Sequence, residues 1–128
     1  MPTKILIADD EKDFVIFMKD ILAESGRAID VAFDGQEALA LIKKNNYDII
    51  FADHKMPKVT GLELIKYVKE KNLRSKIVMI SAYPKMEEAV AKQVGADGYL
   101  EKPVSSKVVE DMINKMLGNQ AGGSAERK

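Results

Sequence analysis

The sequence predicts an α/β fold in which helices cover both faces of a parallel sheet. Strand-like and helix-like segments alternate five times along the chain, a pattern typical of parallel sheets with helical crossovers. Several of the strand-like runs are apolar along their whole length, as expected for strands that are buried on both faces. With 128 residues, the chain is long enough for one domain with a substantial core.

Four apolar runs are the clearest strand candidates, and each stops at polar residues. The runs and the residues that follow them are 4–8 with Asp9 and Asp10, 48–52 with Asp53, 76–80 with Ser81, and 98–101 with Lys102 and Pro103. Parallel strands end at one edge of a sheet, and open α/β sheets bind their ligands there. We therefore expect three carboxylates, one hydroxyl and one ammonium to share a single crevice.

The boundaries of the first three predicted helices carry local signals. The first helix is expected from Glu11 to Ser25, and Gly26 is suited to end it. The next two helices each follow an N-cap residue with glutamate three positions later, a spacing typical of a capping box. These pairs are Asp34 with Glu37 and Thr60 with Glu63.

The remaining elements are expected between residue 84 and residue 117. Pro84 suits the first turn of the fourth helix, and Gly95 can end that helix. Ser105 can cap the fifth helix, whose apolar residues keep helical spacing as far as Leu117. The Gly-rich composition of residues 118–128 is typical of a flexible tail or the start of a linker. The predicted domain therefore covers residues 1–117.

Composition narrows the class of protein. The 20 basic residues balance the 20 acidic ones, which disfavours direct nucleic-acid binding, since such proteins usually show a basic excess or stripe. The absence of cysteine excludes disulfides and thiol chemistry and suits a reducing compartment. Apolar stretches of only about five residues are too short for a membrane span, and the chain enters a strand without room for a signal peptide. We expect a soluble cytoplasmic protein.

These polar residues, in this order, resemble the receiver domain of two-component response regulators. The resemblance covers residues 4–117 and rests on five motifs: Asp9-Asp10, Asp53 with Met56-Pro57 and Gly61, Ser81-Ala82, 95–100, and Lys102-Pro103. It implies a doubly wound, flavodoxin-like sheet of five parallel strands in the order 2-1-3-4-5, with the site where the strand order reverses. Val59-Thr60 and His54 depart from the common pattern, but neither removes a group that the chemistry needs.

The residue types suit phosphoryl transfer. A carboxylate can attack phosphorus and form an acyl phosphate, and the transfer depends on positioning and on neutralising charge on the phosphoryl oxygens. Mg²⁺ does this and prefers one or two carboxylates as ligands. Asp10 and Asp53 would bind the ion directly, and Asp9 would hold a bound water. Lys102 supplies a point charge, and the Ser81 hydroxyl can donate to a phosphoryl oxygen.

The resemblance assigns further roles. It makes Asp53, rather than Asp9 or Asp10, the phosphoacceptor, adds the backbone carbonyl of Lys55 as a metal ligand, and makes the bond before Pro103 cis. The donor would be a phosphohistidine on a sensor histidine kinase or a histidine phosphotransfer protein. The chain would be a signalling domain, because it promotes only its own phosphorylation and dephosphorylation. His54, the only histidine, is poorly placed as a donor.

Phosphorylation is expected to change partner preference. Ser81 would move toward the phosphoryl group, and Tyr99 would turn inward as a rotameric switch, although a strand tyrosine usually serves packing. The surface formed by the fourth predicted helix, the fifth strand and the fifth helix would then repack and bind a downstream effector, and a phosphorylation-dependent dimer is another output of this kind.

The first predicted helix offers a docking surface for the kinase. On a helical wheel, Phe17, Met18, Ile21 and Leu22 form an inward stripe with Phe14 at its edge. Ile16 falls nearly opposite, and Val15 points sideways, so both are expected to be exposed. Two exposed apolar residues beside an acidic crevice would suit a partner's helical bundle.

Two other classes of function remain open. A Mg²⁺-dependent phosphohydrolase with an aspartate nucleophile would resemble haloacid-dehalogenase-like phosphatases, which carry a second Asp two positions after the first. In this sequence Asp9 and Asp10 are adjacent, and no cap segment is evident. A receiver-like binding module that is never phosphorylated would be expected to lack Asp53, Asp10 or Lys102, and all three are present.

Overall fold

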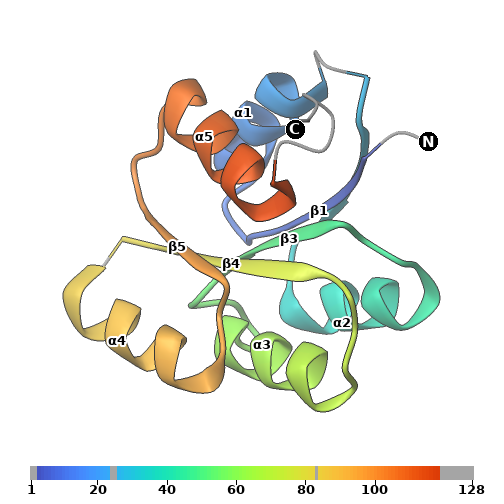
Figure 1. Ribbon diagram of the computed structural model, residues 1–128, viewed down its shortest axis with the longest axis vertical. Coiled ribbons are helices and arrows are strands. Elements are labelled where there is room, and N and C mark those ends of the chain that lie inside the picture. The colour runs from blue at the N-terminus through green and yellow to red at the C-terminus, as the bar shows by residue number, and fades with distance from the viewer. Residues whose placement is uncertain (1–2, 24–25, 83, 119–128) are drawn as a thin grey trace.

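The computed structural model describes residues 3–23, 26–82 and 84–118, in which five strands and five helices alternate along the chain (Figure 1). The elements are β1 (Lys4–Ala8), α1 (Lys12–Ala23), β2 (Ala28–Ala32), α2 (Gly35–Lys44), β3 (Ile49–Asp53), α3 (Gly61–Glu70), β4 (Lys76–Ser81), α4 (Pro84–Val94), β5 (Gly98–Glu101) and α5 (Ser106–Leu117). The strands form one parallel sheet in the order β2-β1-β3-β4-β5. The predicted doubly wound fold and strand order are confirmed.

The sheet separates two apolar cores. Ile7 of β1 and Phe51 of β3 point toward α1 and α5, whereas Leu6 and Ile50 point toward α2, α3 and α4. Figure 1 shows the same division, with α1 and α5 on one side of the sheet and the other three helices on the opposite side. Burial on both faces explains why β1, β3 and β4 are apolar without alternation. It also holds the backbone of these strands in place up to their polar carboxyl ends.

The predicted caps define where three helices start. The Thr60 hydroxyl accepts the Glu63 N–H, and the Glu63 carboxylate accepts the Thr60 N–H, which completes a capping box at α3. Asp34 and Ser105 accept N–H groups in the first turns of α2 and α5 in the same way. These bonds satisfy amides that the helices themselves leave unpaired.

Glycine ends two of the helices at the predicted places. Gly26 follows α1 with φ of +72°, and Gly95 follows α4 with φ of +106°, a backbone region that favours glycine. The predicted end of the first helix at Ser25 and the predicted tail beyond Gly118 lie outside the described residues. Within the described ranges, none of the helices combines the length and the apolar character needed to cross a bilayer.

The prediction for the buried face of α1 was partly wrong. Ile16 is 58% exposed, as expected, but Val15 is only 2% exposed and Phe17 is 43% exposed. The buried stripe is centred on Val15, Met18 and Leu22, which follow helical spacing. The helix is therefore turned slightly about its axis relative to the predicted wheel, and the exposed apolar pair is Ile16 with Phe17.

Candidate functional site

Three aspartates meet where β1 and β3 end. Asp9 and Asp10 follow β1, and Asp53 is the last residue of β3. One carboxylate oxygen from each lies within 4.8 Å of the other two. Asp9 is 1% exposed and Asp53 is 8% exposed, whereas Asp10 lies at the surface. The predicted acidic cluster therefore has two buried members and one that faces solvent.

The backbone after β3 fixes the position of Asp53. The His54 N–H donates to the carbonyl of Ile80, and the Gly61 N–H donates to the carbonyl of His54, both at 3.1 Å. A Cβ atom at position 61 would lie 2.5 Å from the carbonyl oxygen of Asp53, so only glycine permits this approach. The start of α3 thus packs directly on the backbone of Asp53.

Lys102 reaches the cluster from the end of β5. Its backbone N–H donates to the Ser81 carbonyl at 2.8 Å, and the Lys102–Pro103 bond that follows is cis. The ammonium Nζ lies 2.9 Å from Oδ2 of Asp9 and 3.9 Å from Oδ2 of Asp53. The lysine therefore forms its shorter contact with the buried Asp9, and Asp53 lies beyond hydrogen-bonding distance.

A cavity of about 190 Å³ opens above these groups. Its lining combines residues from the ends of four parallel strands: Asp10, Glu11, Asp53, Lys55, Ser81, Ala82 and Lys102. Ser81 is 2% exposed, so its side chain belongs to the wall and not to the rim. Tyr99 is not part of this lining and packs against the core on the side of α2, α3 and α4.

The site carries more negative charge than Lys102 can balance. Burial, with added repulsion from Asp9 and Asp10, raises the pKa of Asp53 to about 7, although the Lys102 charge opposes this. Burial also raises the pKa of Asp9. Burial acts to lower the pKa of Lys102, but its contacts with Glu11 and Asp9 and the nearby Asp53 charge raise it overall. A bound cation would favour the ionised carboxylates.

The donor set fits a hard divalent cation. Three carboxylates offer oxygen ligands within one small space, the ligand type that Mg²⁺ prefers. Among the described residues, Oδ2 of the buried Asp9 accepts no well-aligned hydrogen bond, even though Lys102 lies close to it. This oxygen suits a bound water, and the expectation that Asp9 holds one stays a prediction.

Sequence reasoning missed two residues of the site. The Glu11 carboxylate accepts a hydrogen bond from the Lys102 ammonium, and the Phe14 ring centroid lies 4.5 Å from the same nitrogen. Glu11 is the third acidic residue in a row after β1, a signal that could have placed it at the crevice. Nothing in the sequence distinguishes Phe14 from an ordinary core residue.

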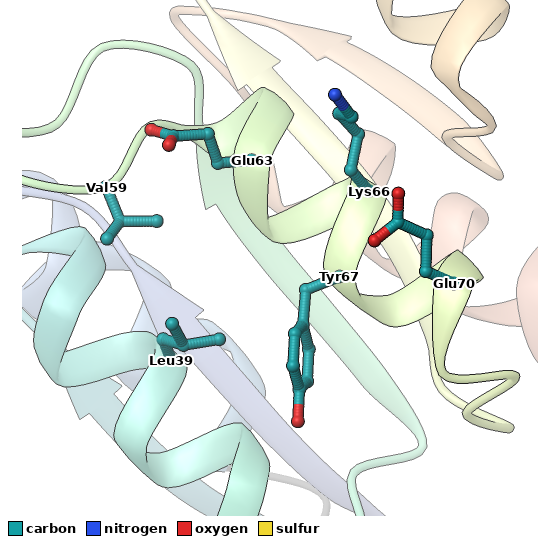
Figure 2. Close-up of a pocket in the computed structure, with 6 residues that line it drawn as sticks. All are labelled: Leu39, Val59, Glu63, Lys66, Tyr67 and Glu70. Carbon is teal, nitrogen blue, oxygen red and sulfur yellow. The ribbon is translucent and has the colours of Figure 1, made fainter.

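A larger hollow of about 330 Å³ lies elsewhere, between α2 and α3 (Figure 2). Its residues are Leu39, Val59, Glu63, Lys66, Tyr67 and Glu70. It contains none of the aspartates, and the Glu63 carboxylate is already used in the α3 capping box. The smaller cavity is therefore the candidate site, because it holds the buried carboxylates and the lysine.

The fold and this acidic edge define a doubly wound domain with three clustered aspartates and a lysine at the carboxyl ends of its strands. Residues 5–114 match the family model of the response regulator receiver domain. The chain therefore belongs to this family, and its class of protein is the response regulator of two-component systems.

Curated relatives are longer than this chain. The alkaline phosphatase synthesis transcriptional regulatory protein PhoP of Bacillus subtilis is 32% identical over a match that covers 100% of this chain and 55% of the relative. The transcriptional regulatory protein DltR of Streptococcus agalactiae is 34% identical, with 78% of this chain and 45% of the relative covered. The chain thus spans about half the length of these relatives.

Solved structures of similar size match along most of their length. The receiver domain of a Francisella response regulator is 36% identical with a TM-score of 0.84, covering 92% of this chain and 98% of that one. A CheY-like receiver domain protein from Methanospirillum hungatei is 28% identical with a TM-score of 0.85, covering 96% and 100%. Both share the overall fold described above.

Proposed function

We propose that Asp53 accepts a phosphoryl group from a phosphohistidine of a partner protein and that the phosphorylated domain changes its partner preference. The observation that carries this proposal is the arrangement around Asp53. Asp53 is 8% exposed and lines the small cavity, with carboxylate oxygens of two further aspartates within 4.8 Å and the Lys102 ammonium at 3.9 Å. Asp53 is the one of the three that belongs to the central strand β3.

In the proposed step, a carboxylate oxygen of Asp53 forms a bond to phosphorus as the bond from phosphorus to the histidine nitrogen breaks. The electron pair of the broken bond stays on the imidazole, which takes up a proton from water. Lys102 stabilises charge on one phosphoryl oxygen, and the Ser81 hydroxyl donates to another.

Asp10 and Asp53, together with the backbone carbonyl of Lys55, would hold Mg²⁺, and Asp9 would act through a water. When bound, the ion supplies positive charge to the phosphoryl oxygens during transfer. Two facts support this role. The three carboxylates crowd one space, and burial raises the pKa of Asp53, so a cation would help to keep the acceptor ionised.

The partners follow from this chemistry. A sensor histidine kinase or a histidine phosphotransfer protein would supply the phosphoryl group in the cytoplasm. The single histidine, His54, does not line the cavity, which supports a donor on another molecule. The face formed by α4, β5 and α5 would carry the output, to an effector or a second copy. Residues 1–117 would act as the receiver domain, with 118–128 as a tail or linker.

Acetyl phosphate with Mg²⁺ tests the acceptor directly. Intact-mass spectrometry should show one added phosphoryl group, stable in acid and labile in base, on the wild-type chain and none on Asp53→Asn. Asp48→Asn, at the opposite end of β3, is the matched control and should be labelled normally. Label that persists in Asp53→Asn would contradict the assignment. Sustained release of phosphate from small esters would instead favour a phosphohydrolase, and an unlabelled wild type would favour a binding module.

A further inference from the structure

Among the described residues, the Lys102 ammonium contacts Asp9, Glu11 and Phe14 besides Asp53, and these neighbours differ in how firmly they are held. It lies 2.9 Å from Asp9, donates to Glu11, and sits 4.5 Å from the ring of Phe14. The side chain of Lys102 is 13% exposed and that of Asp9 is 1% exposed, whereas the side chain of Glu11 is 63% exposed. Asp9 is therefore fixed inside the site, and Glu11 approaches the lysine from the solvent side.

Glu11 and an incoming phosphoryl group need the same donor. An ammonium offers three N–H groups, and in this structure Lys102 donates one of them to Glu11, which lines the same cavity. A phosphoryl group on Asp53 would place its oxygens in that cavity, where Glu11 is also part of the lining. The Glu11 carboxylate and the phosphoryl group both carry negative charge, so their simultaneous approach to Lys102 is unfavourable.

The difference in exposure between Asp9 and Glu11 decides which of the two carboxylates moves away from Lys102. Moving Asp9 away from Lys102 would leave a buried carboxylate without its cation, which is costly. The Glu11 side chain can rotate into water, where a carboxylate is well solvated, and an exposed ion pair is worth little. Lys102 can therefore reach the phosphoryl oxygen by exchanging Glu11 while it keeps its contact with Asp9.

We propose that Glu11 is a positioning residue that holds Lys102 in a resting arrangement and competes with the phosphoryl group for it, so that Glu11 slows phosphorylation of Asp53. This inference rests on the proposed function and deepens it. Glu11 acts through Lys102 and does not itself accept the phosphoryl group. Its removal should therefore speed the reaction only while Lys102 is present.

The initial rate of Asp53 phosphorylation by acetyl phosphate with Mg²⁺ provides the first test. Glu11→Gln should raise this rate by about two- to fivefold, the range expected when a partly exposed ion pair is removed. Asp13→Asn is the matched control, because Asp13 is another exposed acidic residue in the first turn of α1 and is not part of the cavity lining. This control should leave the rate within the error of the wild type.

A double-mutant cycle separates an effect through Lys102 from a general effect of charge. In the Lys102→Gln background, adding Glu11→Gln should change the rate little. Trace labelling with acetic anhydride, without metal or phosphate, gives an independent readout. Glu11→Gln should raise the labelling of Lys102 by about two- to fivefold, relative to Lys107, whose side chain is 83% exposed.

Each outcome decides between the two proposals. A labelled wild type with an unchanged or slower Glu11→Gln variant overturns the role of Glu11 and leaves the proposed function standing. Equal acceleration by Asp13→Asn, or in the Lys102→Gln background, also overturns it, because the effect would then be one of net charge. A wild type that takes no phosphoryl group overturns the proposed function and, with it, this inference.

Discussion

Arg27 and Glu110 form a two-point ion pair that joins the segment before β2 to α5. The two guanidinium nitrogens of Arg27 donate to the two carboxylate oxygens of Glu110 at 2.9 and 2.8 Å. The residues are far apart in sequence, and the side chain of Arg27 is only 13% exposed. This paired geometry is stronger than a single surface contact, so the pair helps to hold the edge strand β2 and the last helix together.

The pair should make stability depend on pH. Hydrogen bonding to Arg27 lowers the pKa of Glu110 below its ordinary value. A lowered pKa in the folded state gives stability that is present above the unfolded pKa and is lost as the pH falls through the folded pKa. Glu110→Gln should therefore reduce the free energy of unfolding by about 0.5–1 kcal/mol at pH 7.

Urea unfolding at several pH values checks this expectation, and the difference between wild type and Glu110→Gln should shrink toward zero in acid. Asp111→Asn is the control, because Asp111 pairs with Lys107 on the exposed face of the same helix. A pH-independent difference for Glu110→Gln would contradict the linkage.

Removal of Asp10 should weaken divalent cation binding. Asp10 is the exposed member of the three clustered aspartates, so its substitution removes a ligand without emptying the buried part of the site. Asp10→Ala should lower Mg²⁺ affinity at least tenfold, or about 1.4 kcal/mol, and should slow labelling by acetyl phosphate. Titration calorimetry measures the affinity, with Asp13→Asn as the charge-matched comparison. Unchanged affinity would remove Asp10 from the ligand set.

Ile16 and Phe17 form the exposed apolar surface on α1 that sequence reasoning had assigned to Val15 and Ile16. Ile16 is 58% exposed and Phe17 is 43% exposed, and both lie in the helix that begins beside the acidic crevice. If a phosphohistidine protein docks here, Ile16→Lys with Phe17→Glu should slow transfer from that protein at least tenfold, about 1.4 kcal/mol of lost interaction.

Labelling by acetyl phosphate should remain normal in this double variant, since the small donor needs no docking surface. Val90→Lys, which alters an exposed apolar residue on the opposite side of the sheet, is the control (Figure 1). Normal transfer from the cognate partner would show that the Ile16–Phe17 surface is incidental.

Phosphorylation should change the part of the molecule that follows Ser81. Beryllofluoride, a mimic of the phosphoryl group, should draw the Ser81 hydroxyl toward it and allow Tyr99 to turn inward. Amide resonances of residues 82–110 should therefore shift more than those of residues 30–45 in two-dimensional NMR spectra. Shifts spread evenly over both ranges would argue against a switch at this face.

Gly61 should be needed for normal labelling of Asp53, whereas the N-cap residue Thr60 should not be needed for it. Gly61→Ala would force its Cβ against the carbonyl oxygen of Asp53, with an expected loss of about 1–3 kcal/mol in stability and slower labelling of Asp53. Thr60→Ala removes the capping box at the same helix end, which costs about 1 kcal/mol, and should leave labelling normal. Equal labelling of both variants would refute this distinction.

Sequence reasoning predicted the features that depend on local patterns. The apolar runs before Asp9, Asp53 and Ser81 identified the strands, because burial on both faces leaves no room for polar residues. Thr60 with Glu63 identified the start of α3, because a capping box needs only residues close in sequence. The strand order came from the family resemblance, since periodicity alone does not fix the order of parallel strands.

Features that depend on tertiary packing were not predictable in this way. The apolar residues of α1 cover enough of the helix surface to allow two alternative buried faces. Packing against β1 and α5 selects the face with Val15 buried. The contact between Lys102 and Glu11 joins residues 91 positions apart. It depends on side-chain conformations that no short sequence pattern specifies.

The position of β5 at the rim of the sheet has a practical consequence for building a phosphorylation sensor. Within the described residues, strand β5 pairs only with β4, whereas strand β3 is hydrogen-bonded on both sides. A fluorescent dye attached to the side chain at position 101, which is exposed, would label a strand with a single neighbour without lengthening the backbone that positions Lys102. An insertion after Asp53 would separate the backbone of Asp53 from Gly61. The rim of the sheet is therefore the place to attach a reporter, and the centre is the part to leave untouched.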